Sequence, residues 1–150
     1  MQDPFLLFGR VETMSKTTYR NASGLPNDEQ LTTARDQATL GRAIQDRFPR
    51  YYRYFATTVF NYRGQSIRNH NRLLGNVEGV DGIKTGYTRA SGFNLVSSMR
   101  RGNRHLVGVV LGGRSGGSRD ATMFVLGPLF WAIPAFGTLR SLMIIYVTLP

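Results

Sequence analysis

The chain has 150 residues, a formal net charge of +10 and no cysteine. A chain of this length forms one domain at most. The lack of cysteine excludes disulfides, thiol catalysis and cysteine-based metal sites. His70 and His105 lie far apart in the sequence and have no neighbours at ligand spacing, so we expect neither a metal nor a cofactor.

Arginine supplies almost all of the positive charge, because 17 of the 19 basic residues are arginines and only Lys16 and Lys84 are lysines. A surplus of this size suits nucleic acid or another anionic surface. The arginines are scattered, however, and no nucleic-acid motif accompanies them. We therefore expect no specific nucleic-acid partner, and a basic surface that favours an anionic environment.

The start of the chain, residues 1–12, matches no pattern and does not predict a secretory signal. An acid comes early, no basic leader precedes the apolar run, and that run is short. An extended segment is then expected over 17–21, leading into a turn at 24–26.

A helix is predicted next, because Thr32 or Thr33 can cap one that runs to about Arg47. Ala34, Ala38 and Ile44 supply part of its apolar face. Phe48-Pro49 is expected to end it, since the residue before a proline is disfavoured in the helical region.

A hairpin follows the helix. Residues 51–60 are aromatic and β-branched, which predicts a partial strand, and the segment 61–64 is suited to a turn. The chain is then expected to return over 66–72.

Three more strands are predicted over 82–88, 92–99 and 104–111, with a hairpin turn at 100–103. The third strand contains the uncharged run 106–111, which is typical of a strand buried on both faces. A second helix is predicted from Ser118 or Arg119. Together these elements predict an α+β fold, in which an antiparallel sheet is flanked by helices.

The tail, residues 125–150, is apolar. Residues 121–139 and 142–150 carry no charge, and the first of these stretches approaches the length of a membrane span. Glycine and proline interrupt it, so a helix packed on the core is favoured. An end scrambled by a frameshift is the second interpretation, and a membrane span is the third.

The most informative stretch is Lys84-Thr85-Gly86, inside the strand-like segment 80–88. Lysine supplies a fixed positive charge, the threonine hydroxyl can donate or accept a proton, and glycine allows a ligand to approach the backbone closely. Because the chain otherwise uses arginine, Lys84 indicates that an ammonium is required here. The triplet predicts one wall of a site for a substrate that bears a carboxylate.

Further motifs surround the triplet. They are Asn21-Ala22-Ser23-Gly24-Leu25-Pro26, Thr32-Thr33-Ala34-Arg35-Asp36, Asn69-His70-Asn71-Arg72-Leu73-Leu74-Gly75, Ala90-Ser91-Gly92-Phe93-Asn94-Leu95-Val96, Gly112-Gly113-Arg114 and Ser118-Arg119-Asp120. With the triplet, they make the chain similar to the D-alanyl-D-alanine carboxypeptidases, the low-molecular-weight penicillin-binding proteins. The resemblance is most specific over 64–120, and we expect a partial catalytic domain over 13–124.

The resemblance implies part of the penicillin-binding protein and β-lactamase fold. It implies a serine-type hydrolase that cleaves the terminal D-Ala-D-Ala bond of peptidoglycan stem peptides through an acyl-enzyme. The expected partners are stem peptides that end in D-Ala-D-Ala and, for the intact parent, β-lactams. The expected location is the periplasm or the extracytoplasmic face of the membrane.

The resemblance also assigns roles to residues. Lys84 would hold positive potential and assist proton transfer, and the backbone N–H of Tyr87 would supply half of an oxyanion hole, so both are catalytic candidates. Thr85 would contact the terminal carboxylate of the substrate, and Gly86 belongs to the same substrate-binding stretch. Arg119 would pair with that carboxylate, since a guanidinium suits it bidentately.

Several of these residues have structural alternatives. Arg119 can instead be an arginine at a helix start that pairs with Asp120, and Gly86 can mark a bulge. Arg114 competes with Arg119 for the carboxylate but is favoured as structural. Asp81 is interpreted as a turn residue before the strand.

Three other polar residues are not assigned to the chemistry. His70 is favoured as a hydrogen-bonded structural residue, because the mechanism of the family needs no histidine. Ser23 and Ser91 are not candidate nucleophiles, because neither begins a Ser-x-x-Lys motif.

Neither the nucleophile motif Ser-x-x-Lys nor the second motif Ser-x-Asn occurs in this sequence. We therefore expect the C-terminal half of a catalytic domain that is inactive alone. Two alternatives stay open: a non-catalytic module that binds peptidoglycan peptides or a partner, and an arginine-rich nucleic-acid binder.

Overall fold

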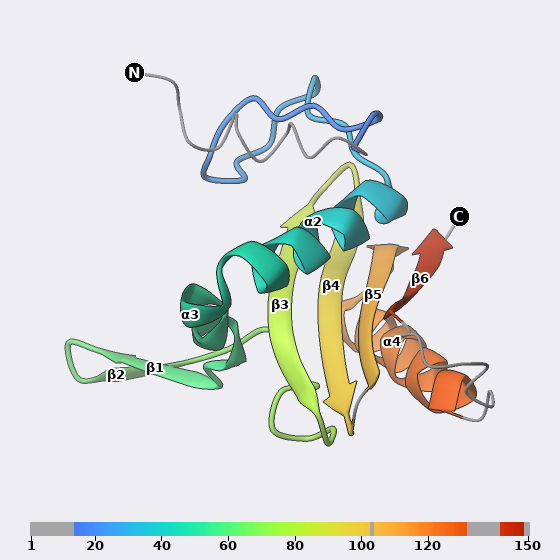
Figure 1. Ribbon diagram of the computed structural model, residues 1–150. Coiled ribbons are helices and arrows are strands. Elements are labelled where there is room, and N and C mark those ends of the chain that lie inside the picture. Colours follow the sequence, from blue (N-terminus) through green and yellow to red (C-terminus); the bar gives the residue numbers. More distant parts are fainter. Residues whose placement is uncertain (1–13, 103, 132–141, 149–150) are drawn as a thin grey trace.

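The computed structural model describes residues 14–102, 104–131 and 142–148. A four-stranded sheet in the order β3-β4-β5-β6 forms its centre. These strands are Val80–Thr88, Gly92–Arg101, Arg104–Gly113 and Leu142–Thr148. Helix α2 (Ala34–Arg47) crosses one face of the sheet and α4 (Gly116–Trp131) lies on the other side (Figure 1). The predicted α+β fold with helices around a sheet is confirmed.

The three predicted strands form β3, β4 and β5, which pair antiparallel as expected, and each is two residues longer than predicted. The tail differs from its prediction. Helix α4 begins at Gly116 and carries the expected helix to Trp131, whereas β6 adds a strand parallel to β5, from His105↔Leu142 to Leu111↔Thr148. Among the described helices, none is both long and apolar enough to cross a membrane.

Helix α2 begins where the sequence predicts. The Thr33 side chain accepts a hydrogen bond from the backbone N–H of Asp36 at 3.2 Å, which caps the helix. The buried Asp36 carboxylate in turn accepts bonds from Lys16 N at 3.0 Å and Thr17 Oγ1 at 2.6 Å. These two bonds attach the segment before the helix to its first turn.

The prediction of a partial strand over 51–60 is wrong for its first half. Pro49 opens a short helix, α3 (Pro49–Tyr52), which continues as the 3-10 helix η1 (Arg53–Ala56). Proline is favoured at the first helical position because its fixed φ suits the helix and its missing N–H is not needed there.

The predicted hairpin is present as β1 (Val59–Tyr62) and β2 (Gln65–Arg68). Its turn is tighter than expected, because only Arg63 and Gly64 lie between the strands. Both have positive φ, 47° and 77°, as a two-residue hairpin turn requires.

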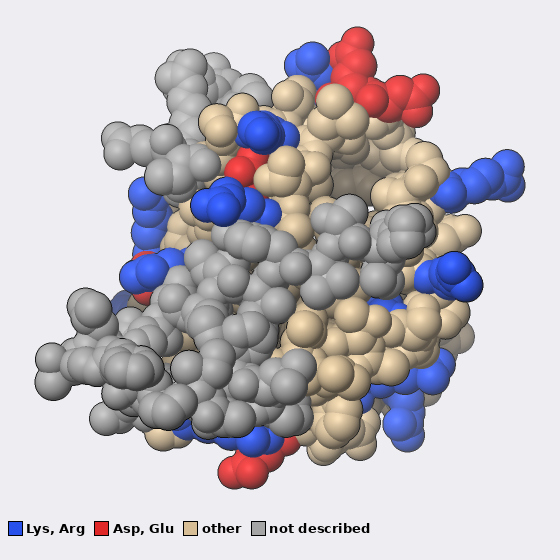
Figure 2. All heavy atoms as spheres, turned by 90° about the vertical axis from the view of Figure 1, so that its right-hand side faces the viewer, with Lys and Arg blue, Asp and Glu red and all other residues tan. Residues whose placement is uncertain are grey.

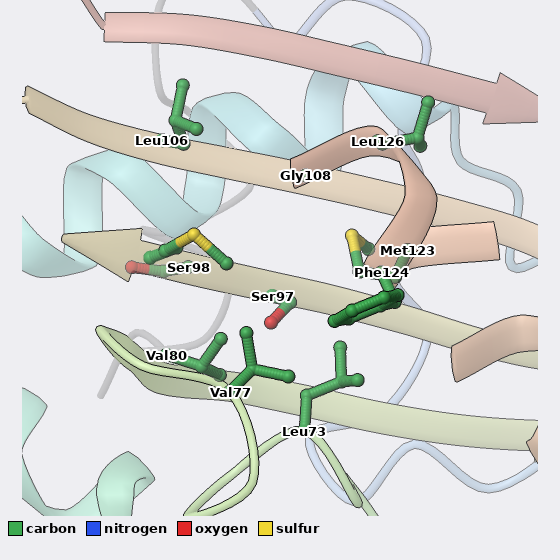
Figure 3. Close-up of a pocket in the computed structure, with 11 residues that line it drawn as sticks. Leu73, Val77, Val80, Ser97, Ser98, Leu106, Gly108, Met123, Phe124 and Leu126 are labelled. Carbon is green, nitrogen blue, oxygen red and sulfur yellow. The ribbon is translucent and has the colours of Figure 1, made fainter. Parts of the chain in front are cut away.

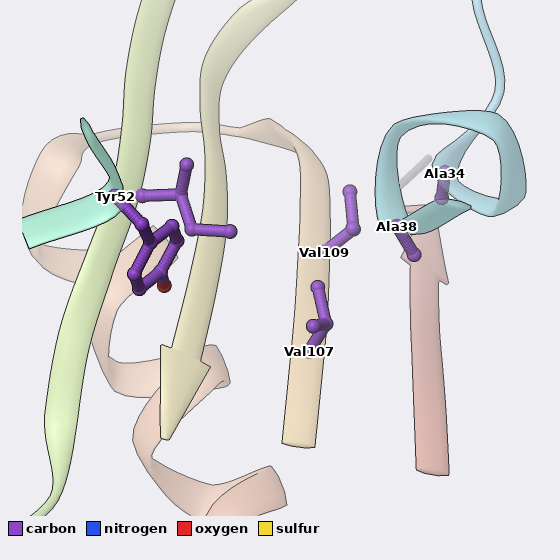
Figure 4. Packing of buried hydrophobic residues seen from close by; sticks show 6 residues of the cluster. Ala34, Ala38, Tyr52, Val107 and Val109 are labelled. Atoms are coloured by element: carbon purple, nitrogen blue, oxygen red, sulfur yellow. The ribbon is translucent and has the colours of Figure 1, made fainter. Parts of the chain in front are cut away.

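Two apolar clusters cover the two faces of the sheet. Under α2 and α3, the cluster contains Ala34, Ala38, Tyr52, Ile83, Val107 and Val109 (Figure 4). Gly41 lets α2 approach closely, since a Cβ there would lie 3.0 Å from Ile83 Cδ1. Under α4, the second cluster contains Leu73, Leu95, Val110 and Met123.

A small apolar hollow remains beneath α4, where Leu73, Val77 and Val80 lie opposite Met123 and Phe124 (Figure 3).

Because Val107 and Val109 belong to one cluster and Val110 to the other, β5 is buried on both faces, as its uncharged run predicts. On the face shown in Figure 2, basic side chains lie apart from one another, which agrees with their scatter in the sequence.

Candidate functional site

The Lys84-Thr85-Gly86 triplet lies on β3, the edge strand of the sheet. Its register against β4 pairs Lys84 with Val96, Thr85 with Leu95 and Gly86 with Asn94. No other described strand pairs with the outer edge of β3. An open edge presents unpaired backbone N–H and C=O groups, which can bind a peptide in an extended conformation.

The triplet is accessible along this edge. Lys84 and Gly86 are exposed, Thr85 is half-buried, and Lys84 Nζ donates a hydrogen bond to the carbonyl of Thr85. A Cβ placed on Gly86 would meet nothing within 4 Å, so packing does not require glycine there. The alternative that Gly86 marks a bulge is wrong, because the register shift of β3 lies between Val80 and Gly82.

Tyr87 follows the triplet on the same strand and pairs with Phe93. Its ring is 61% exposed and tilts against the Phe93 ring, with centroids 4.5 Å apart. This contact fixes the end of the strand beyond Gly86, where the backbone of Tyr87 is the expected oxyanion donor.

Arg119 lies in the first turn of α4 and is only 3% exposed. Its Nε and Nη2 donate to Oδ1 of Asp120 at 2.9 and 2.7 Å, and Nη2 also donates to the carbonyl of His70 at 3.0 Å. A longer contact of 3.5 Å joins Nη1 to the carbonyl of Asn94, the residue paired with Gly86. The structure thus contains the Asp120 pair that the sequence offers as the alternative.

The ion pair between Arg119 and Asp120 lowers the net positive charge of the candidate site. A buried pair is neutral as a unit, and the second carboxylate oxygen of Asp120 is buried without a hydrogen-bond partner. Arg114 is exposed in the loop before α4. At the triplet itself, the positive charge comes from Lys84.

Two buried side chains hold the start of β3. Asn71 Nδ2 and Ser97 Oγ each donate to the carbonyl of Gly82 at 3.0 Å. Asn71 also accepts a bond from the backbone N–H of Leu73 at 3.1 Å, which fixes its orientation. The loop before β3 and the neighbouring strand therefore converge on one peptide group two residues before Lys84.

A polar cluster around Asp81, the residue before Gly82, contains one residue from each of five elements. These are Gln45 of α2, Tyr52 of α3, Asp81 of β3, Ser98 of β4 and His105 of β5. Tyr52 and Ser98 donate to Oδ1 of Asp81 at 2.9 and 2.7 Å. Gln45 Nε2 lies 2.8 Å from the Tyr52 hydroxyl and 2.7 Å from Ser98 Oγ, while His105 Nε2 lies 3.0 Å from Ser98 Oγ.

Burial shifts the titration of two members of this cluster. Desolvation lowers the pKa of His105, with Arg100 acting in the same direction and Asp81 and Asp46 acting against it. Desolvation also raises the pKa of the Tyr52 phenol, so Tyr52 stays a hydrogen-bond donor to Asp81 at neutral pH. Asp81 is thus a half-buried, hydrogen-bonded residue of β3 and not a simple turn residue.

Sequence reasoning missed this cluster, although two signals were present. Ser97 and Ser98 are adjacent polar residues in a strand whose neighbours are apolar, and Gln45 follows Ile44 on a helix that packs on the sheet. A buried polar side chain needs a partner, so such residues predict an internal hydrogen-bond network.

The residues set aside from the chemistry lie in turns and loops. Ser23 donates to Oδ1 of Asn21 at 3.3 Å, and Ser91 lies 2.6 Å from Thr88 Oγ1 in the β3–β4 turn. His70 is exposed and contributes its backbone carbonyl to Arg119. Within 14–102, 104–131 and 142–148, no group of three or more histidines and carboxylates could hold a metal ion.

Comparison with known proteins places these features in a family. A family model described as D-alanyl-D-alanine carboxypeptidase matches residues 11–115. The chain is 36% identical over 130 residues to the D-alanyl-D-alanine carboxypeptidase DacA of Escherichia coli K12. The matched region covers 86% of this chain and 32% of that protein. DacC of the same organism is 38% identical over 103 residues, 68% of this chain and 26% of the relative.

Solved structures give the same result. Penicillin-binding protein 5 from Haemophilus influenzae matches with a TM-score of 0.75 and 28% identity, over 85% of this chain and 37% of that one. Penicillin-binding protein D2 from Listeria monocytogenes, solved in its ampicillin-bound form, matches with a TM-score of 0.63 and 26% identity, over 76% and 49%. The chain spans about a third of the length of its curated relatives. It belongs to the D-alanyl-D-alanine carboxypeptidase family of penicillin-binding serine peptidases, of whose catalytic domain it forms a part.

Proposed function

We propose that this chain provides the substrate-binding wall of a serine-type D-alanyl-D-alanine carboxypeptidase that acts on peptidoglycan stem peptides. The observation that carries the proposal is an accessible Lys84-Thr85-Gly86 on an open edge strand whose first residues are held by buried hydrogen bonds. We call Lys84–Tyr87 the recognition wall. Its expected location is outside the cytoplasmic membrane, where stem peptides occur.

In this proposal the end of the peptide lies extended along β3. The ammonium of Lys84 attracts the terminal carboxylate, and the Thr85 hydroxyl donates a hydrogen bond to it. Gly86 leaves the strand free of a side chain that would hold the peptide away. The backbone N–H of Tyr87 is directed at the carbonyl oxygen of the scissile bond, where negative charge develops when a serine attacks.

Arg119 is the second carboxylate partner in the proposal. The contact between Nη1 and the Asn94 carbonyl is long, so Nη1 is the donor that is available to the carboxylate of a ligand. The bonds to Asp120 would then keep the guanidinium in place. The competing role is purely structural, and the two roles predict different results for substrates with and without a free carboxylate.

The binding step can be measured on the chain as it exists. N-acetyl-L-Lys-D-Ala-D-Ala is titrated into labelled protein, and we expect NMR shift changes at the recognition wall. Lys84→Gln should weaken the binding about tenfold, because an ionic hydrogen bond contributes about 1.5–3 kcal/mol. Lys16→Gln is the matched control, since Lys16 is the other lysine of the chain and is exposed. Equal loss in both variants, or shifts elsewhere only, would contradict the proposed wall.

Arg119 is tested with the same peptide and its C-terminal amide. We expect Arg119→Lys to weaken binding of the free acid about tenfold, because the charged bond from Nη1 to the carboxylate is lost, and to leave the weaker binding of the amide unchanged. Asp120→Asn tests whether loss of the ion pair alone produces this effect. Equal losses for acid and amide in Arg119→Lys would show that Arg119 is structural.

Covalent chemistry is tested with penicillin and mass spectrometry. The sequence has no Ser-x-x-Lys motif, so we expect no acyl adduct on this chain. Peptide binding without an adduct would favour a non-catalytic binding module for the chain alone. A stoichiometric adduct would show that another serine acts as the nucleophile and would refute the expected inactivity.

A further inference from the structure

The segment between Asp46 and Glu78 is basic and aromatic without a single acid. It contains six arginines, namely Arg47, Arg50, Arg53, Arg63, Arg68 and Arg72. It also contains seven aromatic residues, namely Phe48, Tyr51, Tyr52, Tyr54, Phe55, Phe60 and Tyr62. All six arginines are exposed, and so are most of the rings. The stretch between Asp81 and Asp120 is also basic and free of acids, so this segment differs from it by the several exposed rings that accompany its arginines.

The β1–β2 hairpin is the most exposed part of the segment. All eight of its strand residues are exposed. Phe60 pairs with Ile67 across the strands and stacks with Tyr62, with ring centroids 6.1 Å apart. Because paired residues and residues two apart share one face, Phe60, Tyr62 and Ile67 form one apolar face. Arg63 lies over the Tyr62 ring, 5.2 Å from its centroid.

The hairpin projects from the rest of the fold, away from the four-stranded sheet (Figure 1). Asn69 connects its base to the preceding loop through bonds to the carbonyls of Thr58 and Thr57, at 2.8 and 2.9 Å. The neighbouring helices present Tyr51 and Tyr54 as well, and Arg53 lies 5.2 Å from the centroid of the Tyr54 ring. A two-stranded hairpin with an exposed apolar face is stabilised by a surface that covers that face.

The charge determines what kind of surface fits. Six exposed arginines without a carboxylate between them favour an anionic partner. Tyrosine and arginine carry an apolar body and a polar end, so they are suited to the interface between water and a bilayer, where guanidinium groups meet phosphates. Single-stranded nucleic acid needs a groove that follows its backbone, whereas a projecting hairpin fits a flat surface.

We propose that the β1–β2 hairpin, with the exposed tyrosines of α3 and η1, docks on an anionic lipid surface. The apolar face of Phe60, Tyr62 and Ile67 enters the interface, and Arg53 and Arg63, which lie over the Tyr54 and Tyr62 rings, bind the headgroup phosphates. This docking surface is separate from the recognition wall and does not depend on the function proposed for it. It would hold the protein at a membrane without a spanning helix.

The full chain is tested by co-sedimentation with vesicles of equal parts phosphatidylglycerol and phosphatidylcholine. We expect binding to these vesicles, little binding to pure phosphatidylcholine, and weakening as salt rises. Arg53→Gln/Arg63→Gln should lower the partition coefficient about fivefold for each arginine. Phe60→Ser/Tyr62→Ser keeps the charge and should lower it at least about tenfold, because two buried rings are lost.

The matched control removes two charges elsewhere. Arg89→Gln/Arg114→Gln changes two exposed arginines outside the segment, and we expect binding within about twofold of the parent chain. Equal loss in this control would show that net charge alone binds the vesicles. Full binding by Phe60→Ser/Tyr62→Ser would show that no ring enters the interface. Absence of vesicle binding, or preferential binding to single-stranded DNA or to an acidic protein, would refute a lipid partner.

Discussion

The two ends of strand β3 differ in how they are held. At its start, the carboxylate of Asp81 and the carbonyl of Gly82 together accept four hydrogen bonds from buried or half-buried side chains on α3, β4 and the preceding loop. Three residues later, Lys84 and Gly86 are exposed and a Cβ on Gly86 would meet no atom. Side-chain hydrogen bonds thus hold the start of β3, whereas the triplet is held by its backbone pairing with β4 and keeps its side chains accessible.

Removing the anchor is expected to have the largest effect on this difference. Asp81→Ala leaves the Tyr52 and Ser98 hydroxyls without their shared acceptor. Each hydroxyl that loses its acceptor costs about 1–3 kcal/mol, and both hydroxyls retain other contacts. We therefore expect a loss of about 3 kcal/mol in the free energy of unfolding. Urea denaturation followed by circular dichroism measures it. Asp28→Ala, which changes an exposed acid, is the control. A similar loss of stability in both variants would show that Asp81 does not support β3.

A pair of glycine substitutions compares the two ends on the same strand. A Cβ at Gly82 would lie 2.9 Å from the Tyr52 hydroxyl and 3.2 Å from Phe55 Cβ. Gly82→Ala should therefore cost about 2 kcal/mol of stability through overpacking. Gly86→Ala should stay within about 0.5 kcal/mol of the parent, because its Cβ enters open space. Comparable melting temperatures for the two variants would show that the start of β3 is not tightly packed.

The smallest expected effect comes from pH. Burial lowers the folded-state pKa of His105 below its usual value of 6.5, so the unfolded chain binds more protons as the pH falls through that value. The stability contributed by the neutral His105 is therefore present above about pH 6.5 and is lost on acidification. Thermal unfolding between pH 7 and pH 5 should show a smaller drop for His105→Gln than for the parent. His70→Gln, at an exposed histidine, is the control, and an equally reduced drop in both variants would contradict a specific role of His105.

Local patterns in the sequence were sufficient to predict most of the sheet and helix α2. The turn residues at 100–103 and the uncharged run 106–111 indicate the strands of this sheet, and the hydroxyl of Thr33 indicates the start of α2. The residues over 51–56 were misread because aromatic side chains favour strands, although Pro49 at a first helical position was a usable signal. The parallel pairing of β6 with β5 could not be predicted locally, since it joins residues far apart in the chain.

The triplet of the candidate site is visible in the sequence, whereas the residues that support it are not. Lys84, Thr85 and Gly86 are adjacent, so the sequence alone brings them together. The cluster around Asp81 joins residues from five elements, and no local pattern connects Gln45 with His105. For Arg119 both the ligand-binding and the ion-pair interpretations were consistent with the sequence, because the neighbouring Asp120 supports the second as well as the helix start.

The open edge of β3 also bears on self-association. A strand whose outer backbone groups are unpaired is a template for the same strand of a second copy, and natural proteins discourage such pairing by placing lysine on the edge. Lys84 lies near the middle of β3, where two copies joined edge to edge would bring like charges together. The ammonium of Lys84 thus opposes edge-to-edge pairing of two copies and favours the proposed carboxylate ligand. Its neutralisation would therefore promote self-association as well as weaken the proposed binding.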